Sequence, residues 1–230
     1  VHLRENNGIS SSLNFAVKFV TTKYFLQISP DIDFNFSDLN LFIDFANKKK
    51  DNFAALGPRF LGVNESSHRQ IKENLEFGEI ESIHGSCMFI NKKNFMKMEG
   101  FDENFFLYFE ETDYCKRSKK KNLYAYQLNK IFIKQNGRSV SLNSDDEKEK
   151  LEKLLTWHFI WSKFYYFKKH YSIYFALIYF LPIFIRILFR MFIYITYNRN
   201  KFNRYYYRFH GLVNAIFGKK AHMRLNKILN

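Results

Sequence analysis

Three carboxylates lie within four residues of one another, at Glu110, Glu111 and Asp113, and aromatic side chains precede them. A carboxylate held among apolar rings is suited to accept a proton from a hydroxyl group, as a general base does. If a helix begins near Phe109, Glu110 and Asp113 share one face at a spacing of three residues, while Glu111 points elsewhere. The same acids would also complement the dipole of a helix N-terminus. The pattern alone therefore indicates either a catalytic site or an ordinary helix start.

The longer stretch that contains these acids resembles a known signature. Residues 100–117 read GFDENFFLYFEETDYCKR. They resemble the G-G-F-D-E-x-F-F-x-Y-x-E-D-x-D-x-x-x-R signature of bacterial family-2 glycosyltransferases, particularly rhamnosyltransferase-like members. Glu99 stands in place of the first Gly, and Glu111 in place of the Asp that is the family's usual base. The resemblance implies catalytic roles for Glu111, Glu110 and Asp113 and an acceptor-side place for Asp102 and Glu103.

Shorter motifs occur in the order that the family would require. Residues 5–8 read ENNG and resemble the start of a donor-binding stretch that also includes Asn14. Residues 85–88 read GSCM and resemble a strand that lines the acceptor side. The resemblance extends over roughly residues 3–140. It implies donor contacts from Asn7, Gly8 and Asn14 and acceptor-side contacts from Gly85 and Ser86.

Two charged residues are candidates for binding a diphosphate. Residues 26–31 read LQISPD and resemble the family's strand ending in N-P-D, so the resemblance implies that Asp31 binds the donor diphosphate or its metal ion. Lys134 occupies the place of a family His, and because a protonated Lys cannot ligate a metal, it would offset diphosphate charge directly. The expected metal is Mg²⁺ or Mn²⁺, which prefer oxygen ligands, and Lys134 would reduce the need for it. Asp33 is expected to be a turn residue, and His84 a strand residue with its hydrogen bonds satisfied.

The resemblance also implies a fold and a reaction. The fold would be an α/β domain of the GT-A type that binds a nucleotide sugar, and transfer would invert the anomeric carbon. The acceptor would be a lipid-linked or cell-surface glycan, as in polysaccharide or lipopolysaccharide biosynthesis, with rhamnose as the leading sugar. Family members begin with a strand and loop that grip the nucleotide base. Because no counterpart is visible here, the domain is expected to be N-terminally incomplete.

The order of apolar and polar segments agrees with a layered α/β domain. Helices are expected over 13–22, 38–48, 92–98 and 109–120. Strands are expected over 24–28, 54–61, 83–90, 123–128 and 131–134, with a polar loop over 64–76.

The charge of the chain divides it into parts. The formal net charge is +14, but 13 of the 36 basic residues and none of the 22 acidic residues lie after residue 155. The body is therefore nearly neutral and the tail strongly basic, which is typical of a protein held at an anionic surface. We expect a catalytic domain over 1–142, a charged linker over 143–155 and a basic, aromatic, membrane-associated helical region over 156–230.

The tail contains a long apolar segment over 171–197 whose only charged residues are Arg186 and Arg190. Its uninterrupted apolar part, residues 173–185, is shorter than the roughly 20 residues that a spanning helix needs. A helix lying in the membrane interface is therefore expected, with Arg and Tyr at headgroup level. A tilted spanning helix and a buried helix of a soluble core remain alternatives.

Two other functions are compatible with the sequence. Basic residues interleaved with Tyr and Phe are typical of nucleic-acid-binding proteins, but the aromatic residues here form a continuous apolar segment, so no nucleic acid is expected as a partner. A catalytically inactive, membrane-associated relative would show the same departures from the signature. Two cysteines without a metal or disulfide pattern indicate a reducing compartment, and we expect the cytoplasmic face of a bacterial inner membrane.

Overall fold

The computed structural model describes residues 6–61, 70–135 and 144–224. Contacts divide the chain into two compact units. Unit 1 holds a β-sheet with its helices, and unit 2 holds three long helices together with residues 7–10 and 103–109. Glu5 of the donor-binding stretch lies outside the described residues, and so do residues 64–69 of the expected 64–76 loop.

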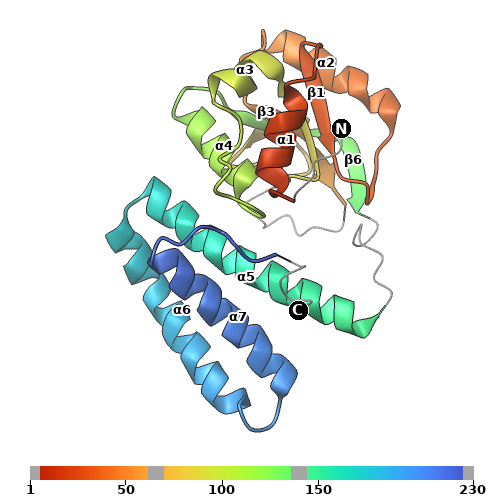
Figure 1. The fold of residues 1–230 in the computed structure, drawn as a ribbon. Coiled ribbons are helices and arrows are strands. Elements are labelled where there is room, and N and C mark those ends of the chain that lie inside the picture. The colour runs from red at the N-terminus through yellow and green to blue at the C-terminus, as the bar shows by residue number, and fades with distance from the viewer. Residues whose placement is uncertain (1–5, 62–69, 136–143, 225–230) are drawn as a thin grey trace. The chain divides into compact units, whose positions relative to one another are not determined.

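Unit 1 is built on a six-stranded mixed sheet (Figure 1). Its strands are β1 (Tyr24–Ile28), β2 (Ile32–Asp33), β3 (Ala55–Phe60), β4 (Phe77–Ile80), β5 (Cys87–Asn91) and β6 (Ala125–Gln135). The order is β1-β5-β3-β6-β2, and β4 also pairs with β6. β3 and β6 are parallel, whereas the other pairs are antiparallel.

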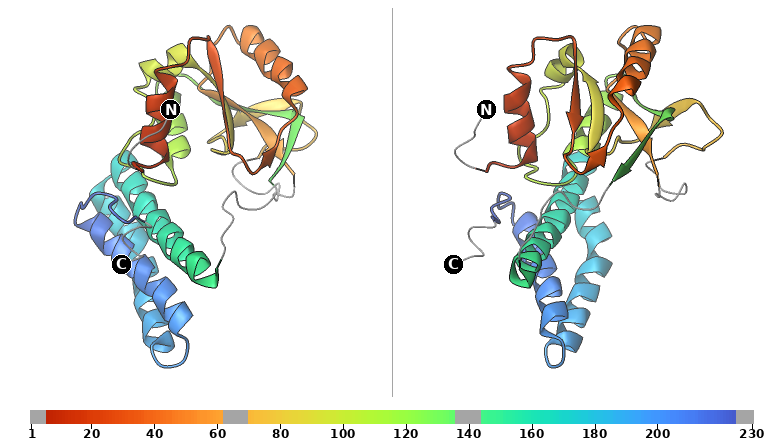
Figure 2. Two further views of the ribbon diagram at one scale, coloured as in Figure 1. Left: turned by 45° about the vertical axis from the view of Figure 1, so that its right-hand side comes forward. Right: turned by 90° about the vertical axis from the view of Figure 1, so that its right-hand side faces the viewer.

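Helices cover both faces of this sheet, which gives three layers (Figure 2). The helices of unit 1 are α1 (Ile9–Val17), α2 (Leu39–Lys48), α3 (Lys92–Lys97) and α4 (Glu110–Lys119), with a short 3-10 turn at Phe36–Asp38. Side chains alternate along each strand. In β5, Met88 and Ile90 therefore pack with α1, α3 and α4, whereas Cys87 and Phe89 pack with α2.

Unit 2 contains α5 (Asp145–His170), α6 (Ile173–Tyr194) and α7 (Arg199–Ile216), which pack side by side (Figures 1 and 2). Trp157 and Phe164 of α5, Phe180 of α6 and Leu212 of α7 are fully buried in their shared core. Each helix begins at a side-chain cap, for example Ser144 Oγ accepting a hydrogen bond from the Glu147 amide. Among the described residues, α6 alone is long and apolar enough to cross a membrane.

The structure differs from the sequence-based expectations at several boundaries. The predicted linker 143–155 is helical from Asp145 onward, because Ser144 caps α5. The two strands expected over 123–128 and 131–134 form the single strand β6, and a register shift against β3 absorbs the irregularity between them. The first helix ends at Val17 rather than at residue 22. β4 was not predicted, and the helical region expected over 156–230 was not divided into separate helices at the turns before α6 and α7.

Candidate active site

The neighbouring ends of β1 and β5 bring two loops of unit 1 together. Ile28 pairs with Cys87 at the end of the antiparallel ladder, and the Ser29 amide then donates a 2.8 Å hydrogen bond to the Ser86 carbonyl. The turn that carries Asp31 therefore lies beside the turn that carries Gly85 and Ser86. The expected strand 83–90 is shorter than predicted, since β5 begins at Cys87 and leaves these two residues in the turn.

Gly85 marks the point where two of the predicted catalytic carboxylates meet. A Cβ atom placed on Gly85 would lie 3.7 Å from Glu110 Oε1 and 3.9 Å from the Glu111 carboxyl carbon. The same point is 3.9 Å from Gln27 Nε2, which donates a 2.5 Å hydrogen bond to the Gly85 carbonyl. Glu110 and Glu111 therefore face the same point, contrary to the expectation that Glu111 points away. A glycine here adds no side chain to the space beside both carboxylates.

Both carboxylates lie at the N-terminus of α4, which begins at Glu110. Glu110 and Glu111 are buried, with exposed fractions of 5% and 6%. The chain enters α4 through two successive residues in the left-handed region, Tyr108 (φ 69°) and Phe109 (φ 71°). Left-handed aromatic residues are strained, and such strain is concentrated at functional sites. The backbone that leads into α4 is therefore strained at Tyr108 and Phe109, directly before the two acids.

Asp113, the third acid, has a different environment. Its Oδ2 atom lies 2.7 Å from Nε of Arg117, one turn later in α4. The Arg117 guanidinium also donates hydrogen bonds to the carbonyls of Met98 and Gly100, the latter at 2.6 Å. Asp113 is fully buried. Asp113 thus orients an arginine that holds the loop before Phe101, a positioning task within the same signature.

The predicted donor-side residues Asn7, Gly8 and Asn14 lie on or near α1. Asn14 forms two hydrogen bonds with the Phe101 backbone, accepting from its amide at 2.9 Å and donating to its carbonyl at 2.8 Å. Gly8 has φ +90°, and a Cβ there would lie 2.5 Å from the Phe106 carbonyl oxygen. Asn7 is exposed. The structure thus gives Asn14 and Gly8 structural tasks, and their donor contacts stay predictions.

The remaining predicted residues occupy the sheet edge and the loop before α4. β2 pairs with β6 so that Lys134 lies opposite Asp33. Asp33 is therefore a strand residue rather than the expected turn residue, and Lys134 lies opposite a residue that is two positions after Asp31. Asp102 is half-buried and Glu103 is exposed; their acceptor-side roles stay predictions.

Two site residues had no functional prediction. Gln27 lies in an apolar strand, where a single polar residue carries little sequence signal, yet it contacts the carbonyl of Gly85. His84 accepts a 3.3 Å hydrogen bond from the Ser86 amide and packs on Phe60 with ring centroids 4.6 Å apart. The expectation that His84 has its hydrogen bonds satisfied agrees with this contact, although it lies in the loop before β5 rather than in a strand.

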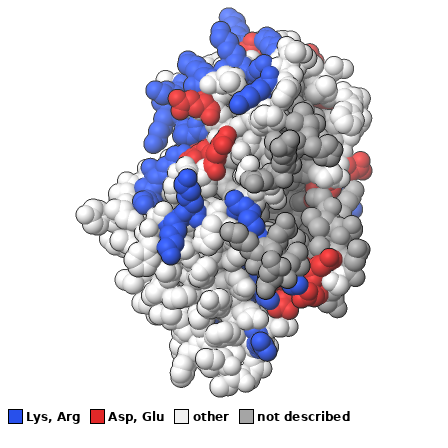
Figure 3. Space-filling model, in the orientation of Figure 1, with Lys and Arg blue, Asp and Glu red and all other residues white. Residues whose placement is uncertain are grey.

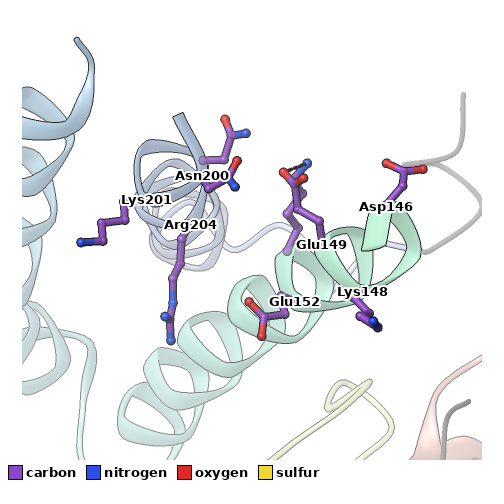
Figure 4. A pocket seen from close by; sticks show the side chains of 9 residues that line it. Asp146, Lys148, Glu149, Glu152, Asn200, Lys201 and Arg204 are labelled. Atoms are coloured by element: carbon purple, nitrogen blue, oxygen red, sulfur yellow. Dashed lines mark ion pairs between the residues drawn. The ribbon is translucent and has the colours of Figure 1, made fainter. Parts of the chain in front are cut away.

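A cavity of about 520 Å³ in unit 2 lies between the start of α5 and the start of α7 (Figure 4). Its lining mixes acids such as Asp146 and Glu149 with bases such as Lys201 and Arg204. Lys150 and Lys153 form ion pairs with these two acids one turn apart along α5. The lining therefore mixes acids and bases, and it contains neither of the predicted catalytic glutamates.

No protein-family model matches the chain. The chain is 26% identical over 142 residues to the low-salt glycan biosynthesis hexosyltransferase Agl10 of Haloferax volcanii, a match that covers 51% of this chain and 45% of the relative. The chain therefore spans about half the length of this curated relative. The similarity to a hexosyltransferase supports the interpretation of this chain as part of a glycosyltransferase.

Among solved structures, the chain is similar to the mannosyltransferase PcManGT from Pyrobaculum calidifontis in complex with GDP-Man and Mn²⁺. The TM-score is 0.53 at 12% sequence identity, and the match covers 96% of this chain and 70% of that chain. At this identity the likeness concerns the fold. The mixed α/β architecture expected from the sequence is confirmed, and it is shared with a glycosyltransferase.

Proposed function

We propose that this chain carries the catalytic part of a glycosyltransferase that moves a hexose from a nucleotide-sugar donor to an acceptor hydroxyl. The observation that supports this most directly is the meeting of Glu110 and Glu111 at Gly85, beside the turn that carries Asp31. A base and a diphosphate-binding acid at neighbouring loops are what such a transfer requires. The hexosyltransferase relative and the fold shared with a mannosyltransferase support the same reaction class.

In the proposed reaction, the Glu111 carboxylate accepts the proton of the acceptor hydroxyl. The hydroxyl oxygen then forms a bond to the anomeric carbon of the sugar, while the bond from that carbon to the diphosphate oxygen breaks on the opposite face. The anomeric configuration is thereby inverted, and the nucleoside diphosphate leaves with the bonding electrons. Glu110 holds the acceptor beside Glu111. Lys134 of β6 and Asp31, which directly precedes β2, bind the diphosphate near the pairing of these two strands.

A divalent cation fits the donor side. Among the described residues no group of three or more His, Cys, Asp or Glu side chains could hold a metal ion by itself. Mg²⁺ and Mn²⁺, however, are commonly bound by one or two carboxylates together with substrate phosphates. Asp31 is a half-buried carboxylate on a turn and suits this arrangement. The cation would offset the charge of the leaving diphosphate, and Asp31 would be its protein ligand.

The finer parts of the proposal concern family, sugar and acceptor. The signature over residues 100–117 supports a GT-A fold of family-2 type with rhamnosyltransferase-like members as the nearest pattern, and rhamnose is itself a deoxyhexose. The acceptor is proposed to be a lipid-linked or cell-surface glycan, as in polysaccharide or lipopolysaccharide synthesis. The basic tail supports a place on the cytoplasmic face of a membrane.

The test is a donor panel with the full chain. GDP-mannose, dTDP-rhamnose and UDP-glucose are supplied with Mn²⁺ or with a chelator, and release of nucleoside diphosphate is measured together with donor binding by calorimetry. We expect at least one donor to bind and to be turned over, with the anomeric configuration of any glycan product inverted by NMR. A chain that binds none of these sugars would contradict the proposal. A product that retains the configuration would overturn the mechanism alone.

A further inference from the structure

One face of α6 is apolar and carries no protein partner among the described residues. The buried face of the helix, which includes Ala176, Phe180 and Ile187, packs on α5 and α7. The opposite face consists of six large apolar side chains at spacings of three or four, here called the apolar stripe: Tyr174, Ile178, Leu181, Ile185, Phe189 and Phe192. These side chains are 57–79% exposed.

An apolar stripe in this position is unusual for a helix in water. The face of a packed helix that points away from its core is normally polar, and contiguous exposed apolar surface marks a site of interaction. Figure 3 shows a broad area without charged side chains over α6, at the lower left of the view. Something apolar therefore covers this face in the functional protein.

Basic side chains beside the stripe indicate what that partner is. Arg186 and Arg190 lie one turn apart on α6, both exposed, and Arg204 and Arg208 lie one turn apart on α7. Contacts between the two helices align them, with Phe184 packed on Phe209 at 5.8 Å between ring centroids. We call these four arginines the arginine cluster.

Arg204 lines the charged cavity together with acids at the start of α5, such as Glu149, but the cluster has no acidic residue within its own segment. Residues 156–230 contain no Asp or Glu. Burial lowers the pKa of Arg208, and the nearby positive charges of Arg204 and Arg186 lower it further. Tyr194 accepts a 3.0 Å hydrogen bond from Arg190, and its ring stacks on Tyr205 of α7. An apolar face flanked by several cations fits the surface of an anionic bilayer.

The pairing of α6 with α7 also decides how the helix would lie in lipid. If α6 crossed the bilayer, its midpoint near Phe184 would lie at the membrane centre. Phe209 packs on Phe184, so Arg208 of α7 would be at the same depth, with Arg186 close by. Charged side chains without acidic partners are strongly disfavoured there. In a helix parallel to the surface, the arginine cluster instead reaches the lipid phosphates.

We propose that α6 lies parallel to the surface of an anionic phospholipid membrane, with the apolar stripe among the acyl chains and the arginine cluster on lipid phosphates. The packed side of α6 remains against α5 and α7. This inference is independent of the reaction proposed above, because it rests on unit 2 alone.

The first test measures binding of the full chain to vesicles by co-sedimentation. Phe189→Glu should lower the partition coefficient about tenfold or more, because it removes the contact of an aromatic ring with the acyl chains and places a charge in lipid. Met96→Glu is the matched control, since Met96 is an exposed residue of α3 in unit 1, and it should bind like the unmodified chain. Equal binding of Phe189→Glu and the unmodified chain would overturn the proposal.

A second comparison tests the arginine cluster. The double variant Arg186→Ala/Arg190→Ala should bind phosphatidylglycerol-containing vesicles roughly 25-fold more weakly, at about fivefold for each lost cation near an anionic surface. The pair Lys120→Ala/Lys121→Ala removes the same charge from exposed positions in unit 1 and should change binding little. If both pairs weaken binding equally, net charge alone accounts for it and the cluster is refuted. Complete release from neutral vesicles at high salt would refute the apolar stripe and favour a polyanion such as RNA as the partner.

Orientation is decided by depth measurements. Tyr174→Cys, Leu181→Cys and Phe192→Cys place a nitroxide label at the start, middle and end of the apolar stripe, while the native Cys87 and Cys115 are buried. A helix parallel to the surface predicts equal, shallow depth at all three positions. A label that is deepest at Leu181 and shallow at both ends would show a spanning helix and overturn the proposed orientation.

Discussion

The Nε atom of Arg117 lies 2.7 Å from the Oδ2 atom of Asp113, within a signature that the sequence associates with catalysis. This ion pair separates two tasks among three neighbouring acids. Glu110 and Glu111 face Gly85, whereas Asp113 faces an arginine that binds the carbonyls of Met98 and Gly100. The stretch thus contains both the two predicted catalytic acids and an ion pair that positions the loop before Phe101.

The first prediction tests the supporting task of Asp113. Asp113→Asn leaves the partly buried Arg117 without its counter-charge, and breaking a buried pair costs about 3–5 kcal/mol. We expect the free energy of unfolding, measured by urea titration and circular dichroism, to fall by about 3 kcal/mol. Arg117→Lys keeps the positive charge but should not keep the stability of the unmodified chain, because a lysine lacks the fork that reaches several carbonyls. An Asp113→Asn protein with full stability and no activity would instead make Asp113 catalytic.

The second prediction concerns Glu111 as general base. Glu111→Gln removes the proton acceptor but keeps the side-chain volume, so kcat should fall at least ~100-fold while donor affinity stays nearly unchanged. Steady-state kinetics with the donor identified by the panel measure kcat, and calorimetry measures donor affinity. Glu81→Gln changes an exposed acid of the same unit and serves as the control. Unchanged turnover in Glu111→Gln would move the role to Glu110 or Asp113.

Much of unit 1 could be predicted from its sequence, because local patterns and packing agree there. The helix α2 and the strand β1 follow apolar spacing closely. β4 was missed because Phe77-Gly-Glu-Ile80 is short and half polar, and its pairing with β6 is a long-range contact. The helical region over 156–230 was expected, but the bounds of α7 were not, because they depend on how it packs on α5 and α6.

The site was predictable in its residues more than in its geometry. A motif names Glu110 and Glu111, but their meeting at Gly85 depends on the left-handed entry at Tyr108 and Phe109, which no local pattern indicates. The Asp113–Arg117 pair could have been read from its spacing of four residues on a helix. The contact of Gln27 with Gly85 could not, because it depends on the register between β1 and β5.

The third prediction tests the donor-side acid. Asp31→Asn keeps the shape of the turn but removes the charge that would hold a cation or meet the diphosphate. We expect weaker donor binding, measured by calorimetry, with a larger loss in Mn²⁺ than in chelator if a metal bridges the two. Asp33→Asn, two residues later and exposed on β2, is the matched control. Donor affinity that is the same in Asp31→Asn and the unmodified chain would contradict the assignment.

The fourth prediction compares two glycines. At Gly85 an added methyl would meet its neighbours only at ordinary contact distances of 3.7–3.9 Å, so Gly85→Ala should fold with stability changed by less than about 1 kcal/mol. It would nevertheless fill the space between Gln27 and the carboxylates, so KM for the acceptor should rise. At Gly8, φ is +90° and the methyl would lie 2.5 Å from the Phe106 carbonyl oxygen. Gly8→Ala should therefore destabilise the protein by about 1–3 kcal/mol, measured by thermal unfolding. Equal stability of Gly8→Ala and Gly85→Ala would contradict the predicted difference between the two glycines.

The last prediction concerns the pH dependence of unit 2. His158 of α5 is fully buried, stacks on Phe106 at 4.6 Å between ring centroids, and has its Nε2 atom 3.0 Å from the Met223 carbonyl oxygen. Burial lowers the pKa of His158 to about 4 from its ordinary 6.5. In the unfolded chain the ring binds a proton near pH 6.5, whereas the folded protein resists protonation until near pH 4. The stabilisation is therefore complete above pH 6.5 and is lost as the pH falls toward 4, by about 3 kcal/mol in all.

Tryptophan fluorescence makes this measurable for unit 2, because the two tryptophans of the chain, Trp157 and Trp161, lie beside His158 on α5. We expect the urea midpoint to fall steadily from pH 7 to pH 4.5 in the unmodified chain. His158→Phe keeps a ring against Phe106 but cannot titrate, so its midpoint should depend less on pH. A smaller slope should remain, because burial and the neighbouring His222 also lower the pKa of His210. Identical pH slopes in His158→Phe and the unmodified chain would show that His158 does not control the acid sensitivity of this helical unit.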